Sequence, residues 1–126
     1  ARVDGVDWYW PADEDPRSRR WKPHDQVRLL TPFDPVVWDR RRFEMFWGWT
    51  YRFEAYTPAA KRKLGYYALP VLWGERVIGW GNLSVVGDEL RSTFGYVDGH
   101  RQRDSSFRAE CEAELERACV FLGLGE

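Results

Sequence analysis

The sequence predicts an α+β fold: a mainly antiparallel, partly barrel-like β-sheet with a short internal helix and a C-terminal amphipathic helix packed on it. Strand-like runs between residues 66 and 96 are separated by Gly74-Glu75 and Gly87-Asp88, which suit two-residue hairpin turns. Near the C-terminus, apolar residues recur at the spacing of one helical face. The chain has no internal repeat and its length suits one domain, so we expect a single β-rich domain over residues 1–126.

The first part of the chain alternates between strand and loop signals. Residues 2–10 predict a strand, because apolar and polar side chains alternate until Pro11 ends the run. Residues 11–25 are rich in Pro, Asp and Arg without periodicity, which predicts a long loop. A second strand is expected at residues 26–30, and the prolines of residues 31–35 predict a pair of tight turns.

The middle of the chain predicts a helix, a strand and a basic connection, in that order. Residues 39–47 are good helix formers, with Asp39 as the N-cap and Gly48 at the end. Residues 51–56 alternate in hydrophobicity and predict a strand. Residues 57–64 predict a short helical connection, because a proline near their start suits the first turn of a helix.

The last third of the chain predicts a β-meander followed by a helix. Strands are expected at residues 66–73, 76–86 and 89–96. The helix that follows carries one apolar stripe, made of Phe107, Cys111, Leu115, Ala118, Cys119 and Leu122. A capping residue at 104–106 begins the helix and Gly123 ends it. We expect the stripe to pack on the sheet, with the glutamates of the opposite side in water.

Composition excludes several kinds of site. Cys111 and Cys119 lie about 12 Å apart along the predicted helix, too far for a disulfide, so two free thiols and a cytoplasmic location are expected. His24 and His100 lie far from both cysteines in the sequence, so neither a metal site nor a cofactor is expected. No apolar run has the length of a membrane span, so no membrane contact is expected.

The net charge of -1 conceals a basic central region between two acidic ends. Residues 16–108 contain 17 of the 19 Lys and Arg residues and 10 of the 20 Asp and Glu residues, a balance of +7. A surface that faces phosphates has this kind of charge distribution, and so does a solvated surface with internal ion pairs. Because the sequence does not show which charges share a face, both interpretations stay open.

The candidate nucleic-acid-binding residues form two clusters in this basic region. They are Arg40, Arg41, Arg42, Lys61, Arg62 and Lys63. The guanidinium groups of the first cluster match phosphate oxygens, and pairing with Asp34, Asp39 or Glu44 is the alternative. The second cluster has no acid nearby in the sequence, which favours phosphate contact.

Two further polar features have structural alternatives. The basic residues 17–22 surround Trp21, a mixture that suits nucleic-acid backbone and base stacking or, equally, a solvated loop. Glu54 has no visible partner for acid–base catalysis, so a structural pairing is favoured, with Arg52 on the same face of the predicted strand.

A run of motifs between Val27 and Val77 carries a resemblance to a known family. In order these motifs are Pro32-Phe-Asp-Pro35, Trp38-Asp-Arg-Arg-Arg42, Tyr51-Arg-Phe-Glu-Ala-Tyr56, Lys61-Arg-Lys-Leu-Gly-Tyr-Tyr67 and Leu69-Pro-Val-Leu72. Their order resembles the C-terminal region of the winged-helix DNA-binding proteins of the crosslink-repair DNA glycosylase (YcaQ-like) family. The chain departs from this family where a basic pattern Gly-Arg-x-Asp-Leu-Lys is usual, because residues 79–84 are Gly-Trp-Gly-Asn-Leu-Ser.

The resemblance implies that the chain is the C-terminal fragment of a larger protein, in which several winged-helix modules precede a β-barrel-like domain. Enzymes of this family excise alkylated or crosslinked bases by cutting their glycosidic bond, with a Gln-x-Gln or Gln-x-Asp motif in the winged-helix part. Gln26 and Gln102 begin no such motif, so no catalytic residue is carried over to this chain. Whether the parent protein is an active DNA glycosylase stays open.

The sequence therefore predicts an accessory DNA-binding and structural domain of a DNA-repair glycosylase-like protein. The expected partners are double-stranded DNA, bound through the parent protein, and the winged-helix modules of the same protein. The alternative is a protein-interaction or purely structural module that docks on its own N-terminal part without DNA contact. Salt dependence separates the two, because phosphate contacts weaken steeply as salt rises whereas aromatic docking barely responds.

Overall fold

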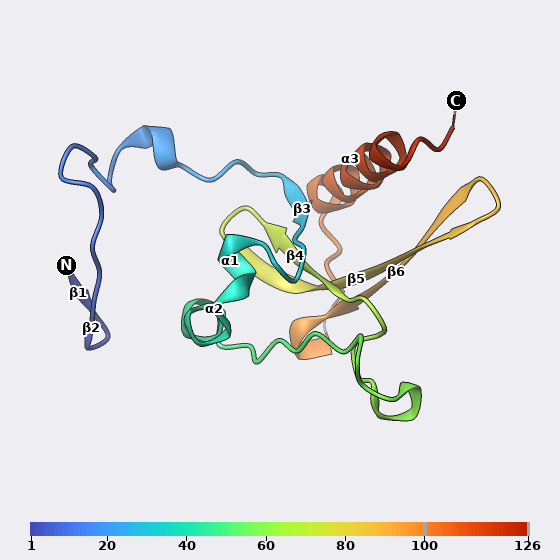
Figure 1. Cartoon of the computed structure of the whole chain (residues 1–126). Coiled ribbons are helices and arrows are strands. Elements are labelled where there is room, and N and C mark those ends of the chain that lie inside the picture. Colours follow the sequence, from blue (N-terminus) through green and yellow to red (C-terminus); the bar gives the residue numbers. More distant parts are fainter. Residues whose placement is uncertain (100, 126) are drawn as a thin grey trace.

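The computed structural model describes residues 1–99 and 101–125 and confirms the α+β class. Four strands form one antiparallel sheet in chain order, namely β3 (Val27–Leu29), β4 (Leu69–Trp73), β5 (Arg76–Val86) and β6 (Glu89–Tyr96). Within the described residues this sheet stays open, with β3 and β6 at its edges, and does not close into a barrel. Figure 1 shows β5 and β6 as a long hairpin that extends past the other two strands.

The predicted β-meander is confirmed, although its first strand is shorter than predicted. Gly74 and Gly87 make the two turns with φ of +60° and +62°, a conformation that glycine adopts without strain. A register shift between Val71 and Leu72 interrupts the pairing of β4 with β5. Such an irregularity bends a strand and increases its twist.

The internal helix is confirmed, and a shorter helix precedes it. α2 (Arg40–Trp47) begins after Asp39, whose carboxylate accepts a backbone N–H of the first turn, and ends at Gly48 in the left-handed conformation. The second of the two predicted tight turns is wrong. Instead, Pro35 is the first residue of α1 (Pro35–Trp38), where its missing N–H costs nothing, and Asp34 caps that helix.

The single N-terminal strand is also a wrong prediction, because the chain reverses within it. β1 (Arg2–Val3) pairs with β2 (Val6–Asp7) around Asp4-Gly5, two residues with positive φ. Asp-Gly is a strong signal for this kind of turn. The small hairpin lies apart from the main sheet (Figure 1), and Trp8 attaches it to α2 by stacking on Phe46 with 5.3 Å between ring centroids.

Residues 51–56 belong to no strand, so the strand predicted there is wrong. Tyr51 is buried in a hydrophobic cluster with residues of β5, and its hydroxyl donates a hydrogen bond to the backbone oxygen of Ala68 (2.7 Å). The segment therefore packs on the face of the sheet without strand pairing, and its buried residues, Tyr51 and Glu54, do not alternate as in a strand. Residues 1–99 and 101–125 also contain three single-turn 3₁₀ helices: η1 (Arg19–Trp21), η2 (Ala59–Lys61) and η3 (Val97–Gly99). η2 is the short helix predicted within residues 57–64.

The sheet separates two hydrophobic clusters. On one face, Phe43 of α2 and Tyr51 pack with Val77. On the other face, Phe107 of the C-terminal helix packs with Ile78. Val77 and Ile78 are neighbours in β5 and face opposite clusters, as the alternation of a strand requires. α2 and the C-terminal helix therefore lie on opposite sides of the sheet (Figure 1).

The C-terminal helix is α3 (Ser105–Leu122), and both of its predicted ends are confirmed. Its first half packs on the sheet as predicted, since Phe107 is buried and Cys111 is half-buried. The packing prediction is wrong for the last turn, where Leu122 is exposed. Among the described helices, none combines the length and the apolar character needed to cross a membrane.

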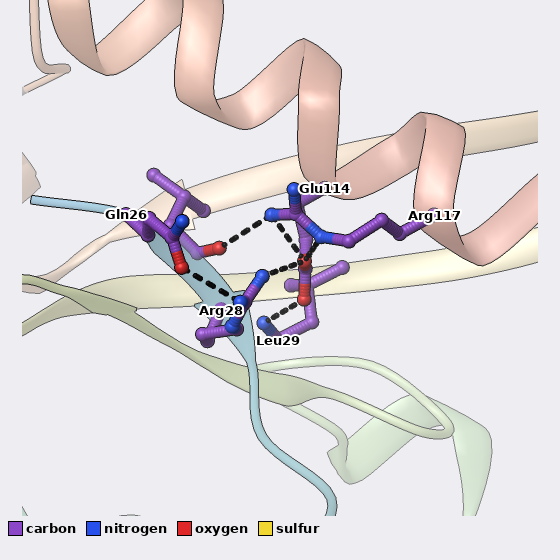
Figure 2. Close-up of polar contacts among 6 residues, drawn as sticks. Gln26, Arg28, Leu29, Glu114 and Arg117 are labelled. Atoms are coloured by element: carbon purple, nitrogen blue, oxygen red, sulfur yellow. Dashed lines mark hydrogen bonds and ion pairs between the residues drawn. The ribbon is translucent and has the colours of Figure 1, made fainter. Parts of the chain in front are cut away.

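A half-buried carboxylate fixes α3 to the edge strand β3 (Figure 2). Glu114 accepts a hydrogen bond from the backbone N–H of Leu29 (2.8 Å). It also accepts hydrogen bonds from the guanidinium groups of Arg28 (3.2 Å) and Arg117 (2.8 Å). Arg117 donates in addition to the backbone oxygen of Val27 (3.2 Å). Side chains of α3 thus satisfy backbone groups at the edge of β3 that no other strand pairs.

Replacing Glu114 with glutamine is expected to lower the free energy of unfolding by about 2 kcal/mol, because the charge-assisted hydrogen bonds to α3 and β3 are lost. Urea unfolding followed by tryptophan fluorescence measures the change. Glu112→Gln, at an exposed position of the same helix, is the control and should change the free energy by less than about 0.5 kcal/mol. Equal effects of the two substitutions would contradict the role of Glu114.

Gly95 in β6 leaves room for the ring of Trp80. A Cβ atom on Gly95 would stand 2.1 Å from that ring, which also stacks on Trp49 with 5.8 Å between centroids. We expect Gly95→Ala to lower the free energy of unfolding by about 1–3 kcal/mol through overpacking, with a change in the near-ultraviolet circular dichroism of tryptophan. Thr93→Ala, at an exposed site on the same strand, is the control. An unchanged spectrum and stability in Gly95→Ala would contradict this packing.

Candidate nucleic-acid interface

A groove lined by basic residues follows the extended segment between α2 and η2. This basic groove has a volume of about 940 Å³ and is lined by Arg40, Trp49, Thr50, Tyr51, Arg52, Phe53, Glu54, Thr57, Lys61, Lys63 and Leu64. Four of its residues carry positive charge and one carries negative charge. Figure 1 shows the segment running from the end of α2 toward the loop that contains η2.

Arg40 is held in a fixed position at the groove. Its guanidinium donates hydrogen bonds to the backbone oxygens of Pro32 (3.2 Å) and Val37. It also lies over the ring of Tyr51, 4.6 Å from the centroid. Burial lowers the pKa of Arg40, but an arginine remains charged in proteins. Burial raises the pKa of Tyr51 to about 12, so its hydroxyl stays protonated.

The other three cations of the groove are exposed. They are Arg52, Lys61 and Lys63. None of the three forms an ion pair with a carboxylate within the part of the chain that the structure describes. Their charges are therefore available to an anion that enters the groove.

Glu54 is the anionic residue of the groove, and backbone N–H groups hold its carboxylate. Only 6% of Glu54 is exposed. Its Oε2 accepts hydrogen bonds from the N–H groups of Lys63 (2.8 Å), Leu64 (2.7 Å) and Gly65 (3.3 Å). Burial would raise the pKa of Glu54, but these hydrogen bonds and the charge of Lys63 outweigh it and keep the pKa below its usual value. The carboxylate is therefore ionised and fixes the loop, so its structural role is as expected, although its partner is not Arg52.

Asn82 of β5 holds the same loop from the other side. Its Nδ2 donates a hydrogen bond to the backbone oxygen of Leu64 (2.8 Å). Gly65 packs directly on Asn82, because a Cβ atom there would stand 2.3 Å from Oδ1. Asn82 and Trp80 are two of the positions at which the chain departs from the basic pattern of residues 79–84. Here Asn82 holds the loop that carries Lys63, and Trp80 stacks on Trp49 of the groove.

Arg41 and Arg42 of the first predicted cluster lie outside the basic groove. Both line a separate hollow of about 530 Å³ between α2 and the N-terminal hairpin, which also includes Trp8 and Met45. Arg42 donates a hydrogen bond to the backbone oxygen of Pro35. The first cluster is therefore divided between two sides of α2.

The acidic residues near the first cluster accept hydrogen bonds from other groups and do not form ion pairs with its arginines. Asp34 and Asp39 accept backbone N–H groups as helix caps. Glu44 accepts a hydrogen bond from the hydroxyl of Thr50 (2.7 Å). Among the described residues these three carboxylates form no salt bridge, so the alternative of an ion-paired arginine cluster is wrong.

The second predicted cluster is divided as well. Arg62 turns away from the basic groove, because its Nε donates to the backbone oxygen of Thr57 (2.8 Å) and its guanidinium lies over the ring of Tyr66 (4.9 Å). Three of the six predicted residues thus line the groove, namely Arg40, Lys61 and Lys63. Sequence reasoning missed Arg52, although its position between two inward-facing aromatic residues indicated an exposed side chain.

The other polar features of the sequence form no second site of this kind. Arg20 pairs with Glu14 (3.4 Å) and lies over the ring of Trp21 (4.3 Å). His24 is exposed, and His100 lies outside the described residues. No group of metal-ligating side chains occurs in residues 1–99 or 101–125.

A known protein family matches most of the chain. The model of a family described as "DNA glycosylase AlkZ-like" matches residues 1–121. No solved structure matches the chain. The family match includes the whole basic groove and nearly all of α3.

Replacing Glu54 with glutamine is expected to lower the free energy of unfolding by about 2–3 kcal/mol at neutral pH, because the backbone N–H groups of the loop lose a charged acceptor. Urea unfolding measures this change. Glu75→Gln, at an exposed turn position, is the control and should have little effect.

The effect of Glu54→Gln should depend on pH in a defined direction. The pKa of Glu54 is lower in the folded protein than in the unfolded chain, so its stabilisation is complete above the unfolded value of about 4.3. It is lost as the pH falls through the folded value. The stability difference between the wild-type protein and the variant should therefore shrink in acid. A difference that grows in acid would contradict the assignment.

Proposed function

The chain belongs to the AlkZ-like DNA glycosylase family, and we propose that it is an accessory DNA-binding and structural domain of a DNA-repair glycosylase-like protein. One observation carries the proposal: Arg40, Arg52, Lys61 and Lys63 line a single groove. The carboxylate of Glu54 in that groove is bound to backbone N–H groups. The groove therefore presents unpaired positive charge, which suits the phosphates of DNA.

Contacts of this type set affinity and register along the duplex. Lysine and arginine side chains that bind phosphate and sugar carry no sequence information by themselves. The fixed guanidinium of Arg40 and the exposed ammonium groups of Lys61 and Lys63 fit such a role, because they need no particular base. The proposed task of the chain is thus to add a sequence-independent grip on DNA.

In this proposal, base excision is carried out by the parent protein, whose winged-helix modules are the other partners of this chain. The parent would excise alkylated or crosslinked bases from double-stranded DNA, with catalytic residues in winged-helix modules and none in this chain. Two free cysteines agree with a cytoplasmic protein. Burial raises the pKa of Cys111, so its thiol is protonated and weakly reactive.

A second candidate function has its own supporting observation. An apolar groove of about 390 Å³ lies between the end of α3 and the β5–β6 hairpin, with Leu83, Val85, Leu90, Phe121 and Leu122 among its lining residues. This surface suits docking on another part of the parent protein, such as a winged-helix module. The apolar groove shares no lining residue with the basic groove, although its Tyr67 contacts Phe53 of the basic groove with 5.0 Å between ring centroids.

Salt titration of DNA binding tests the proposed function. For a fluorescently labelled duplex, Lys61→Ala and Lys63→Ala should each weaken binding and reduce the slope of log K against log salt by about 1, because each removes one phosphate contact. Fluorescence anisotropy at several salt concentrations measures both quantities.

Arg91→Ala removes an exposed cation from β6, outside the basic groove, and is the matched control. It should leave the slope unchanged. Slopes that are unaffected by Lys61→Ala and Lys63→Ala, or lowered equally by Arg91→Ala, would contradict the proposal and favour the docking function.

A further inference from the structure

An exposed aromatic surface adjoins the basic groove. It consists of the exposed rings of Phe33, Trp38, Tyr56 and Tyr67 around the half-buried ring of Phe53, and these rings contact one another. Tyr56 is 94% exposed, Trp38 is 65% exposed and Phe33 is 60% exposed. Phe53 lines the basic groove as well, so the two surfaces are continuous. Large apolar side chains that gather on a surface in this way mark a binding site.

Phe53 meets three of these rings edge to face, and the exposed rings around it keep ring faces open to solvent. Phe53 is at the centre, and its ring stands at 87° to Tyr56 and at 89° to Tyr67. In an edge-to-face pair the edge of one ring meets only one face of the other. Tyr56, which is 94% exposed, therefore keeps a ring face open to solvent, whereas Phe53 also packs against the hydrophobic cluster of Tyr51. Open aromatic faces suit a flat ligand that stacks.

The charges beside these rings define the chemistry of that ligand. Lys61 and Lys63 are exposed in the groove that Phe53 shares with the aromatic surface. A ligand that uses both surfaces must therefore combine negative charge with flat rings. In an unpaired nucleic-acid strand every nucleotide offers both a phosphate charge and a flat base, whereas a duplex keeps its bases stacked inside.

We propose that the basic groove and the aromatic surface together bind an unpaired stretch of DNA. Its phosphates contact Arg52, Lys61 and Lys63, and its bases stack on Phe53 and Tyr56. This inference rests on the proposed function, because the same groove binds the phosphates in both. It adds single-stranded DNA to the duplex as a ligand of the groove. Binding of this kind is tolerant of sequence, since every base offers a flat face.

An apolar protein partner fits this surface less well. Four cations line the adjoining groove, and its carboxylate is bound to the backbone. A partner that covered the rings would have to desolvate those cations or provide acids to pair with them. A polyanion matches the charges without such a cost.

Two oligonucleotides test the inference on the full chain. One is a fluorescently labelled oligothymidine, and the other is an abasic strand of the same length, which has the phosphates but no bases. Oligothymidine should bind more tightly than the abasic strand. Tyr56→Ala should weaken oligothymidine binding about fivefold to tenfold and leave the abasic strand unaffected, because only stacking is removed. Tyr56→Trp, which keeps an aromatic ring at this position, should bind oligothymidine as tightly as the wild-type protein does.

Tyr9→Ala is the matched control, because Tyr9 is 89% exposed and lies outside the groove and the aromatic surface. Equal affinity for the two strands, or an equal loss for both in Tyr56→Ala, would overturn the inference. The proposed function would still stand if, with either of these results, duplex binding still depended on Lys61, Lys63 and salt. Oligothymidine binding that Tyr56→Ala leaves unchanged would also overturn the inference.

Discussion

The buried carboxylate of Glu54 is the constraint on which the basic groove depends. A charge that leaves water must regain its hydrogen bonds, and the backbone N–H groups of Lys63, Leu64 and Gly65 provide them. The loop after η2 is thereby fixed to the segment that packs on the sheet, and Asn82 secures it from β5. The same contacts satisfy the negative charge in the groove. A single acidic side chain therefore gives a basic loop a defined position and leaves the cations around it unpaired.

The departures from the family's basic pattern make sense within this arrangement. At residues 79–84 the chain has Trp80 and Asn82 where charged residues are usual. Trp80 stacks on Trp49 of the groove, and the space for its ring comes from Gly95 in the neighbouring strand. Asn82, which stands where a charged residue is usual, donates a hydrogen bond from a neutral amide to the loop after η2. The positive charge of the groove comes from α2, the extended segment and the loop after η2.

The elements that the sequence predicted well are those whose signals lie within a few residues. α2 was predicted between Asp39 and Gly48, and both hairpin turns of the sheet were predicted at glycines, because caps and turns need no distant partner. Two of the errors also had local causes. Asp4-Gly5 signalled a turn inside the predicted N-terminal strand, and Asp34-Pro35 signalled the start of a helix where a tight turn was predicted. The strand at residues 51–56 was a different error. Its sequence alternates in hydrophobicity, but in the structure the polar Glu54 is buried as well as Tyr51, because backbone N–H groups of a distant loop bind its carboxylate.

The sequence by itself determined that this chain is an α+β domain with a basic centre and unpaired cysteines, because composition, helix caps and turns act over short distances. Only the tertiary structure decided which cations share a surface. Arg40 joins Lys61 and Lys63 in the groove, while Arg41 and Arg42 face the N-terminal hairpin. Successive residues of a helix point about 100° apart, so adjacent arginines in the sequence cannot all face one side. A cluster of charges along a chain becomes a binding surface only where packing turns the side chains in the same direction.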